Sequence, residues 1–376
     1  MRISFNKPFM TGLEKSFLDD VLSGDHLSGN GRYTRRCHTW LEQRLGCTRA
    51  LLSQSGTAGL EMAAILANVG VGDEVIMPSF TFVSTANAFV LRGAIPVFVD
   101  IRPDTLNIDE SKIEAAITSK TRAIVVVHYA GVACEMEAIF EIAQKHGLFL
   151  IEDNAHGMLA SYSGRALGSI GHMAALSFHE TKNIISGEGG ALLVNDERLV
   201  ERSEIIWEKG TNRAKFFRGE VDKYTWVDIG SSFLPSELTA AFLFAQLEHA
   251  DTIIEKRQLI WNAYHSGMEA LEGEGKLQRP QIPSNCRHNA HMYYVLLPSP
   301  ARQEEFLAAM KARGIGVIFH YVPLHSSPAG MRFGRVHGNL TVTDDVFGRL
   351  VRLPMWVGMD EGHVKAVIKA TAEILA

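Results

Sequence analysis

A lysine and an aspartate that each follow a short apolar run carry the strongest chemical signal in the sequence. Asp153 ends the run Leu148–Glu152, and Lys182 follows the run Met173–Phe178. Both runs have the composition of buried strands, and strand ends in an α/β sheet converge on one crevice. A lysine there can form a Schiff base with pyridoxal phosphate (PLP), while a carboxylate keeps the pyridine nitrogen protonated. The pair therefore indicates a PLP site, although many kinds of enzyme contain an Asp and a Lys at such a spacing.

Small and hydroxylated residues occur where the first expected strand turns into a helix. In the segment Ser53–Leu60, backbone N–H groups at a helix start, with the hydroxyls of Ser55 and Thr57, can bind an anion. An ordinary N-capped helix explains the same residues. The segment is neither a P-loop nor a GxGxxG dinucleotide motif.

Three other side chains are placed to reach the same ligand. Phe82 follows the second expected strand and can stack on a flat heterocycle, although most Phe residues belong to the core. His156 lies three residues after Asp153, and Ser177 lies five residues before Lys182. We expect His156 to reach the ring and Ser177 to complete the phosphate site.

Composition describes an ordinary globular protein. The chain has 376 residues, 46% hydrophobic and 21% charged, and a net charge of −5 that favours neither nucleic acid nor an anionic membrane. Its apolar runs are shorter than the ~20 residues of a membrane span, and its N-terminus lacks an apolar signal segment. Its four cysteines lack the spacing of a metal site or disulfide frame. We therefore expect a cytoplasmic protein with reduced thiols and no metal.

Short β-rich runs alternate with helical segments between residues 49 and 195, which predicts a mainly parallel sheet with helices on both faces. The short connection over residues 179–189 allows the last strand to return antiparallel. The expected strands are Ala50–Ser53, Glu74–Pro78, Ile95–Val99, Ala123–His128, Phe149–Asp153, Ala174–Phe178 and Gly190–Val194, with helices that include Thr57–Asn68 and Met136–His146.

The sequence changes character after Pro235, where a smaller α+β module is expected. We accordingly expect a large domain over residues 1–245 and a small domain over residues 246–376. The elements expected beyond Pro235 are one or two long helices over Ser236–Met268, a strand over His291–Leu297, a helix over Arg302–Arg313 and a strand over Gly316–His320.

Five motifs follow one another along the chain: Ser55–Thr57, Pro78–Phe82, Glu152–His156, Ser177–Lys182 and Gly187–Gly190. In this order they resemble the DegT/DnrJ/EryC1/StrS family of nucleotide-sugar aminotransferases, and the resemblance extends from the first residues to about residue 330. The resemblance implies the α/β fold of fold-type I PLP enzymes. That fold has a large domain with a mainly parallel seven-stranded sheet and a smaller C-terminal α+β domain.

The resemblance assigns Lys182 to the Schiff base with PLP and Asp153 to the pyridinium nitrogen. It places Phe82 in the ring-stacking position and His156 beside the ring. It also implies that three residues hold the cofactor phosphate: Gly56, Thr57 and Ser177.

The same resemblance implies transfer of an amino group from L-glutamate to a nucleotide-linked keto sugar. A related branch, which removes a hydroxyl instead, carries His at the lysine position, so Lys182 favours aminotransfer. We expect a dTDP-linked 4-keto-6-deoxy sugar as acceptor, while a UDP-linked sugar and amination at carbon 3 stay open. A non-catalytic PLP-binding regulator is the alternative, and the presence together of Lys182, Asp153 and His156 argues against it.

Basic and aromatic residues between 209 and 226 are the best candidates to contact the substrate diphosphate, and a solvated loop is an equally good explanation by composition. Within this segment we expect Arg218 and Lys223 to bind, while His320 and Tyr321 face the sugar. The resemblance also implies a homodimer with active sites at the subunit interface. Ser232 stands where many family members carry an Asn that reaches the neighbouring subunit, which puts that contact in question.

Overall fold

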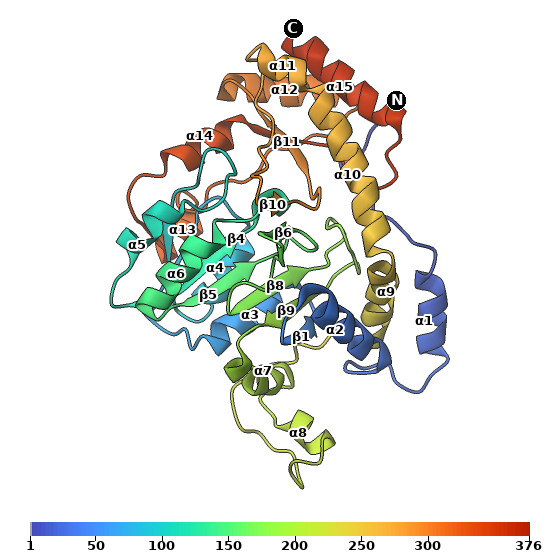
Figure 1. Ribbon diagram of the computed structural model, residues 1–376, viewed down its shortest axis with the longest axis vertical. Coiled ribbons are helices and arrows are strands. Elements are labelled where there is room, and N and C mark those ends of the chain that lie inside the picture. Colours follow the sequence, from blue (N-terminus) through green and yellow to red (C-terminus); the bar gives the residue numbers. More distant parts are fainter. Residues whose placement is uncertain (1) are drawn as a thin grey trace.

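An eight-stranded sheet forms the centre of the computed structural model, which describes residues 2–376 (Figure 1). The strand order is β1-β9-β8-β5-β4-β2-β3-β12. β9 is antiparallel to both of its neighbours, and the other adjacent pairs are parallel. The strands are β1 (Arg49–Ser53), β2 (Glu74–Pro78), β3 (Ile95–Val99), β4 (Thr121–Val127), β5 (Phe149–Asp153), β8 (Met173–Ser177), β9 (Gly190–Val194) and β12 (Arg335–Val336). The predicted fold class and antiparallel return are confirmed, and β12 adds an unpredicted eighth strand.

Alternate side chains along each strand enter different cores. Val75 and Met77 of β2 face one core, while Ile76 between them faces the other. Because both faces are buried, the strands read as continuous apolar runs instead of alternating ones. One face is covered by α3 (Gly56–Leu66), α4 (Val83–Val90) and α7 (Val200–Trp207). The opposite face is covered by α2 (Arg32–Leu45), α5 (Ile113–Ala116), α6 (Met136–His146) and α9 (Glu237–Glu248).

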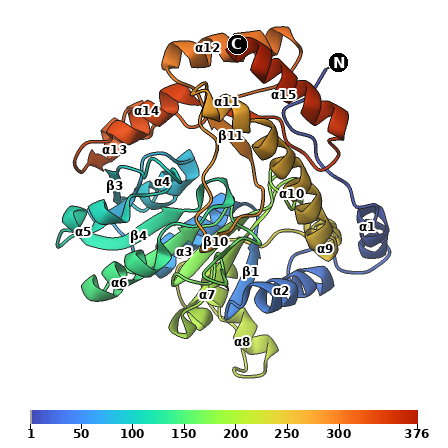
Figure 2. The same ribbon diagram turned by 45° about the horizontal axis from the view of Figure 1, so that its top comes forward.

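A second core lies above the sheet, around the two-stranded antiparallel sheet of β11 (Tyr293–Leu296) and β13 (Leu350–Leu353) (Figure 2). Ile3, near the N-terminus, packs into this core. The helices that pack into it are α10 (Ala250–Gly267), α11 (Glu269–Gly273), α12 (Pro300–Ala312) and α15 (Glu361–Leu375). α14 (Thr341–Arg349) contacts α12 and β11 and contributes Val346 to a separate cluster. The long helices predicted over Ser236–Met268 are confirmed as α9 and α10.

The strand predicted over Gly316–His320 is wrong. Within the described chain this segment pairs through one isolated bridge, between Ile318 and Arg352. Its side chains do not alternate between a core and solvent, because Ile318, Phe319 and His320 all line a cavity beside the sheet. The apolar composition that indicated a strand therefore belongs to a cavity wall.

Shorter elements complete the fold. They are α1 (Glu14–Leu22), α8 (Arg213–Phe217), α13 (Pro328–Phe333), the three-stranded sheet of β6 (Ser161–Tyr162), β7 (Arg165–Ala166) and β10 (Cys286–Arg287), and the 3-10 turns Glu110–Lys112, Tyr129–Gly131 and Glu197–Leu199. The division at residue 245 falls within α9 and stays a prediction. Across residues 2–376, no helix combines the length and apolarity that crossing a bilayer requires.

Candidate active site

The carboxyl ends of the parallel strands border a cavity of about 850 Å³. β1, β5 and β8 run in the same direction, so the residues at their ends meet at one edge of the sheet. The cavity brings together all but two of the site residues predicted from the sequence. Those that line it are Gly56, Thr57, Phe82, Asp153, His156, Ser177, Lys182, His320 and Tyr321.

Asp153 presents a buried carboxylate at the end of β5. The Thr85 hydroxyl donates to its Oδ2 at 2.7 Å, and the Ala155 N–H donates to its Oδ1 at 3.2 Å. Burial raises the pKa of Asp153, and the hydrogen bonds from Thr85 and Ala155 oppose that rise. A buried carboxylate is stabilised by a cationic hydrogen-bond donor, which is what a protonated pyridine nitrogen offers.

Lys182 faces the same cavity from the loop after β8. Burial lowers the pKa of its amine to about 8, and the charge of Asp153 opposes the shift. An amine with this pKa is uncharged, and so nucleophilic, in a larger fraction of molecules near neutral pH than an exposed lysine.

The N-terminus of α3 forms an anion cradle, which we define as Gly56, Thr57 and Ser177. The Ser55 hydroxyl caps the helix by accepting from the Ala58 N–H, so the sequence-based capping explanation holds for Ser55. A Cβ on Gly56 would come within 2.9 Å of the Ser177 Cβ, so glycine is required for this close approach. The free N–H groups of the first helical turn lie where the helix dipole favours an anion.

The ring of His156 provides a flat, uncharged wall. It stacks on His291 with ring centroids 4.2 Å apart, and its Nε2 lies 3.3 Å from the Tyr321 hydroxyl. Burial lowers the pKa of His156 well below its usual value. Phe82 is 58% exposed and lines the cavity, whereas the neighbouring Phe80 belongs to the core at 1%.

These residues fit PLP. The cradle suits its phosphate, Asp153 suits its pyridine nitrogen, and Lys182 suits its aldehyde carbon. In addition, the buried Nδ1 of His156 has no hydrogen-bond partner within residues 2–376, which is expected of a site shaped for a polar ligand. We propose these roles for the cradle, Asp153, His156 and Lys182, with Phe82 against the ring.

Arg218 and Lys223, the other two predicted residues, are not part of the cavity wall. The 209–226 segment, with α8, extends from the bottom of the molecule in Figure 1. Arg218 forms ion pairs with Glu204 at 2.8 Å and Glu220 at 2.6 Å, and Lys215 pairs with Glu201. Two of the basic residues in this segment, Lys215 and Arg218, thus have carboxylate partners within the chain. Contact of Arg218 and Lys223 with substrate stays a prediction.

Thr85 and Arg352 were not predicted from the sequence. Thr85 lies in the first turn of α4, its hydroxyl is 2.7 Å from that of Thr81 in the preceding loop, and it donates to Asp153. Arg352 stands among the apolar residues Leu350, Val351 and Leu353 of β13. A charged residue inside an apolar run is a detectable signal, because arginine is rarely buried without a partner.

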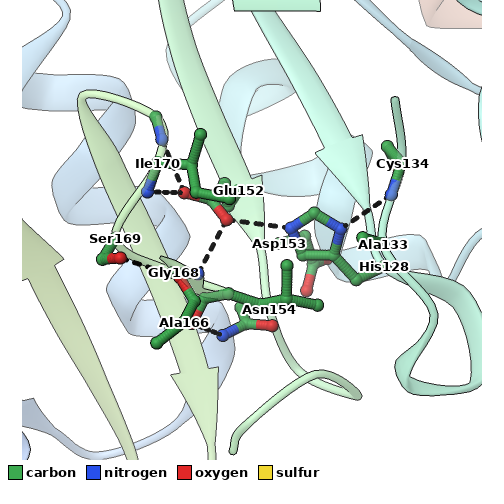
Figure 3. Close-up of polar contacts among 12 residues, drawn as sticks. His128, Ala133, Cys134, Glu152, Asp153, Asn154, Ala166, Gly168, Ser169 and Ile170 are labelled. Carbon is green, nitrogen blue, oxygen red and sulfur yellow. Dashed lines mark hydrogen bonds and ion pairs between the residues drawn. The ribbon is translucent and has the colours of Figure 1, made fainter. Parts of the chain in front are cut away.

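Behind Asp153, the carboxylate of Glu152 forms a closed polar cluster on the opposite side of β5 (Figure 3). It accepts from the N–H groups of Gly168, Ile170 and Gly171 at 2.6–2.8 Å and from His128 Nε2 at 2.9 Å. Because His128 Nδ1 accepts from a backbone N–H at 3.3 Å, the ring proton lies on Nε2. Burial alone would raise the pKa of Glu152, but these hydrogen bonds hold it below its usual value. The cluster thus fixes the strand that presents Asp153.

The fold and the cavity are those of a PLP-dependent aminotransferase, and the chain belongs to the DegT/DnrJ/EryC1/StrS aminotransferase family, whose model matches residues 10–372. GDP-perosamine synthase of Caulobacter vibrioides is 30% identical and covers 100% of this chain and 98% of its own length. The spore coat polysaccharide biosynthesis protein SpsC of Bacillus subtilis is 34% identical over 88% of this chain and 86% of its own. The structure of DesV from S. venezuelae is similar with a TM-score of 0.88, 29% identity, and coverage of 100% of this chain and 98% of that one.

The lowered pKa of Lys182 predicts a specific pH dependence for the cofactor-free protein. Below a pKa of about 8 the amine is protonated and unreactive, so its acylation rate should rise with pH around a midpoint near 8. Peptide mass spectrometry after timed exposure to an acylating reagent measures this rate. Asp153→Asn removes the negative charge that favours protonated Lys182, so the midpoint should move to a lower pH. A midpoint at the ordinary value of a lysine amine, about 10.4, would contradict the prediction.

Glu152→Gln should destabilise the fold. An amide nitrogen donates and accepts nothing, so the pair of donors that faces it, either His128 with Gly168 or Ile170 with Gly171, loses its acceptor. The expected loss in the free energy of unfolding is about 1–3 kcal/mol for each unpaired donor, measured by urea denaturation. Exposed Glu255→Gln is the matched control, and equal stability of the two variants would show that the cluster does not stabilise the fold.

Proposed function

We propose that this protein transfers the amino group of L-glutamate to a nucleotide-linked keto sugar. The observation that carries the proposal is the meeting of Lys182, Asp153 and the anion cradle in one cavity. The name of the relative GDP-perosamine synthase supports a nucleotide-linked acceptor. The name of the relative SpsC, a spore coat polysaccharide biosynthesis protein, supports a role in polysaccharide synthesis.

Within this function we propose a dTDP-linked 4-keto-6-deoxy sugar as the acceptor. The protein would then be a dTDP-4-amino-4,6-dideoxygalactose transaminase that supplies cell-surface polysaccharide synthesis in the cytoplasm. The stretches Phe82–Gly93 and Val221–Trp226 support this assignment by resemblance. The cavity volume of about 850 Å³ lies within the usual range of ligand sites, about 300–1,000 Å³.

The residues of the cavity divide the chemistry among them. PLP, when bound, accepts the electron pair that stays behind when a proton leaves the reacting carbon. Lys182 Nζ removes a proton from the donor carbon that bears nitrogen and returns one to the sugar carbon that receives it. Asp153, oriented by Thr85, holds a proton at the ring nitrogen. The neighbours His320 and Tyr321 border the same space, where we propose that they contact the sugar.

We also propose a homodimer, which the family resemblance implies. Several large apolar side chains around the 209–226 segment are exposed, including Phe217 at 65%, Tyr224 at 52% and Trp226 at 79%. Aromatic residues on one projecting segment are typical of a surface that another chain covers.

Lys182→Ala should abolish amino transfer because it removes both the Schiff-base amine and the base. The loss should exceed the factor of about 10²–10⁴ that a general base alone contributes. Mass spectrometry of products from dTDP-, UDP- and GDP-linked 4-keto and 3-keto sugars with L-glutamate tests the reaction and its acceptor. The proposal fails if no keto sugar in the panel is aminated, or if Lys182→Ala retains comparable turnover.

Trp226→Glu combined with Phe217→Glu should convert the protein from dimer to monomer, since two charges would enter the proposed interface. Light scattering at working concentration measures the mass. Leu259→Glu, at a 70% exposed position on α10, serves as the matched control and should leave the dimer intact. A wild-type protein that is monomeric and fully active would overturn the dimer.

A further inference from the structure

The chain between Ile318 and Leu324 borders the cavity and is fixed at its two ends. At one end, Ile318 and Arg352 exchange backbone hydrogen bonds at 2.8 and 3.3 Å. At the other end, the Leu324 N–H donates to the Ser79 carbonyl at 3.1 Å. We call the residues between these points, 319–323, the wall segment. Within residues 2–376 no backbone N–H of the wall segment donates to a backbone carbonyl, so its position depends on the two ends and on side-chain contacts.

The side chains of Ser79 and His325 form a second connection at one of these ends. Ser79 follows β2 and is fully buried. Its Oγ accepts from the His325 backbone N–H at 3.0 Å and lies 2.8 Å from His325 Nδ1. That nitrogen is the one acceptor that residues 2–376 offer the Ser79 hydroxyl, so the proton of the His325 ring lies on Nε2. His325 Nε2 is 3.4 Å from Asp344 Oδ1 at the start of α14.

These three side chains are of the types that form a Ser–His–Asp catalytic triad, but their placement excludes that role. Ser79 is fully buried, and neither Ser79 nor His325 lines the cavity, so a substrate does not reach the Ser79 hydroxyl. The ring is also reversed, because in the triad the serine faces Nε2 and the aspartate faces Nδ1. The three residues therefore hold the chain in place.

Burial indicates which of the two ring contacts holds the wall segment. The Ser79 contact lies inside the protein, where loss of one partner leaves the other polar group unpaired at a substantial cost. The Asp344 contact reaches a carboxylate that is 60% exposed, and exposed ion pairs contribute little. Ser79 and His325 are thus the effective anchor.

The wall segment carries the two residues proposed to contact the sugar. His320 and Tyr321 both line the cavity. The Tyr321 ring lies 5.7 Å from the Phe80 ring, measured between centroids, and its hydroxyl is 3.3 Å from His156 Nε2. Because Phe80 directly follows Ser79, a shift at Ser79 is passed to Tyr321 through both the backbone and this ring contact.

We propose that Ser79 and His325 are positioning residues that hold the wall segment, and with it His320 and Tyr321, against the sugar of the acceptor. This inference rests on the proposed function for the presence of a sugar, but not on the identity of the sugar or its nucleotide. Since neither Ser79 nor His325 lines the cavity, they act through the wall segment alone.

Replacement of His325 in the PLP-loaded enzyme separates the roles of its two ring nitrogens. His325→Ala, and His325→Gln, whose amide extends toward Asp344, leave the Ser79 hydroxyl without its acceptor. Each should lower kcat/KM for the sugar nucleotide about 5- to 150-fold, the value of one unpaired buried group. The amide oxygen of His325→Asn takes the place of Nδ1 and should restore most of the rate, although it does not reach Asp344.

The half-reaction of L-glutamate serves as the internal reference. It does not use the sugar-facing side chains, so it should change little in all three His325 variants. His146→Ala is the matched control, because it removes a histidine that contacts an exposed carboxylate, Glu114, and no buried hydroxyl. It should match the wild type in both half-reactions. Equal losses in the two half-reactions of His325→Ala would overturn the positioning role in favour of a general effect on the fold.

A second measurement needs no turnover. Hydrogen–deuterium exchange of the PLP-loaded enzyme should be faster across residues 318–326 in His325→Ala and His325→Gln than in the wild type, and His325→Asn should resemble the wild type. Unchanged exchange in His325→Ala would overturn the anchor. A defect in His325→Asn as large as that in His325→Ala would also overturn it and assign the role to Asp344. If no keto sugar reacts, the proposed acceptor fails, while exchange still decides whether Ser79 and His325 hold the wall segment.

Discussion

Burial of the Asp153 carboxylate at the end of β5 is the constraint around which the cavity is organised. A charge in that position requires donors on its protein side and a cation on its open side. Thr85 and the Ala155 N–H meet the first requirement. The cation on the open side has to come from a ligand. Lys182 and Asp153 both line the cavity, and the charge of Lys182 acts on the carboxylate across the space that the ligand occupies. We propose that the pyridine nitrogen of PLP, in its protonated form, meets this requirement for a cation.

The alternation of side chains along β5 explains how the rest of the sheet supports this charge. Asp153 faces the cavity, so the preceding Glu152 must point to the opposite side, where no solvent reaches it. There its carboxylate accepts from three backbone N–H groups and from the ring of His128. The backbone N–H of His128 donates to the Asp153 carbonyl at 3.4 Å. The two adjacent carboxylates therefore have separate tasks. Glu152 fixes the strand, and the fixed strand aims Asp153.

Residues next to strand ends could be predicted from the sequence, because strand order and direction determine where those ends meet. This is why Lys182, Asp153, Ser177 and Gly56 were found together with the fold. Thr85 lies within a helix and Arg352 within an apolar strand, so their place in the cavity depends on tertiary packing and not on a strand end. Tertiary contacts also explain why the strand predicted over Gly316–His320 is wrong, and they pair Arg218 with Glu204 and Glu220, which composition does not reveal.

The positive groups of the cavity differ in kind, and each kind suits a different task. The α3 terminus contributes partial charges from backbone N–H groups, which suit a phosphate that stays bound through every turnover. Lys182 has to lose its proton to act, and burial assists this by lowering its pKa to about 8. A neighbouring arginine adds to that effect by repelling the protonated form. That arginine is Arg352. While its guanidinium has no anionic partner in the described chain, its charge favours the neutral, reactive amine of Lys182.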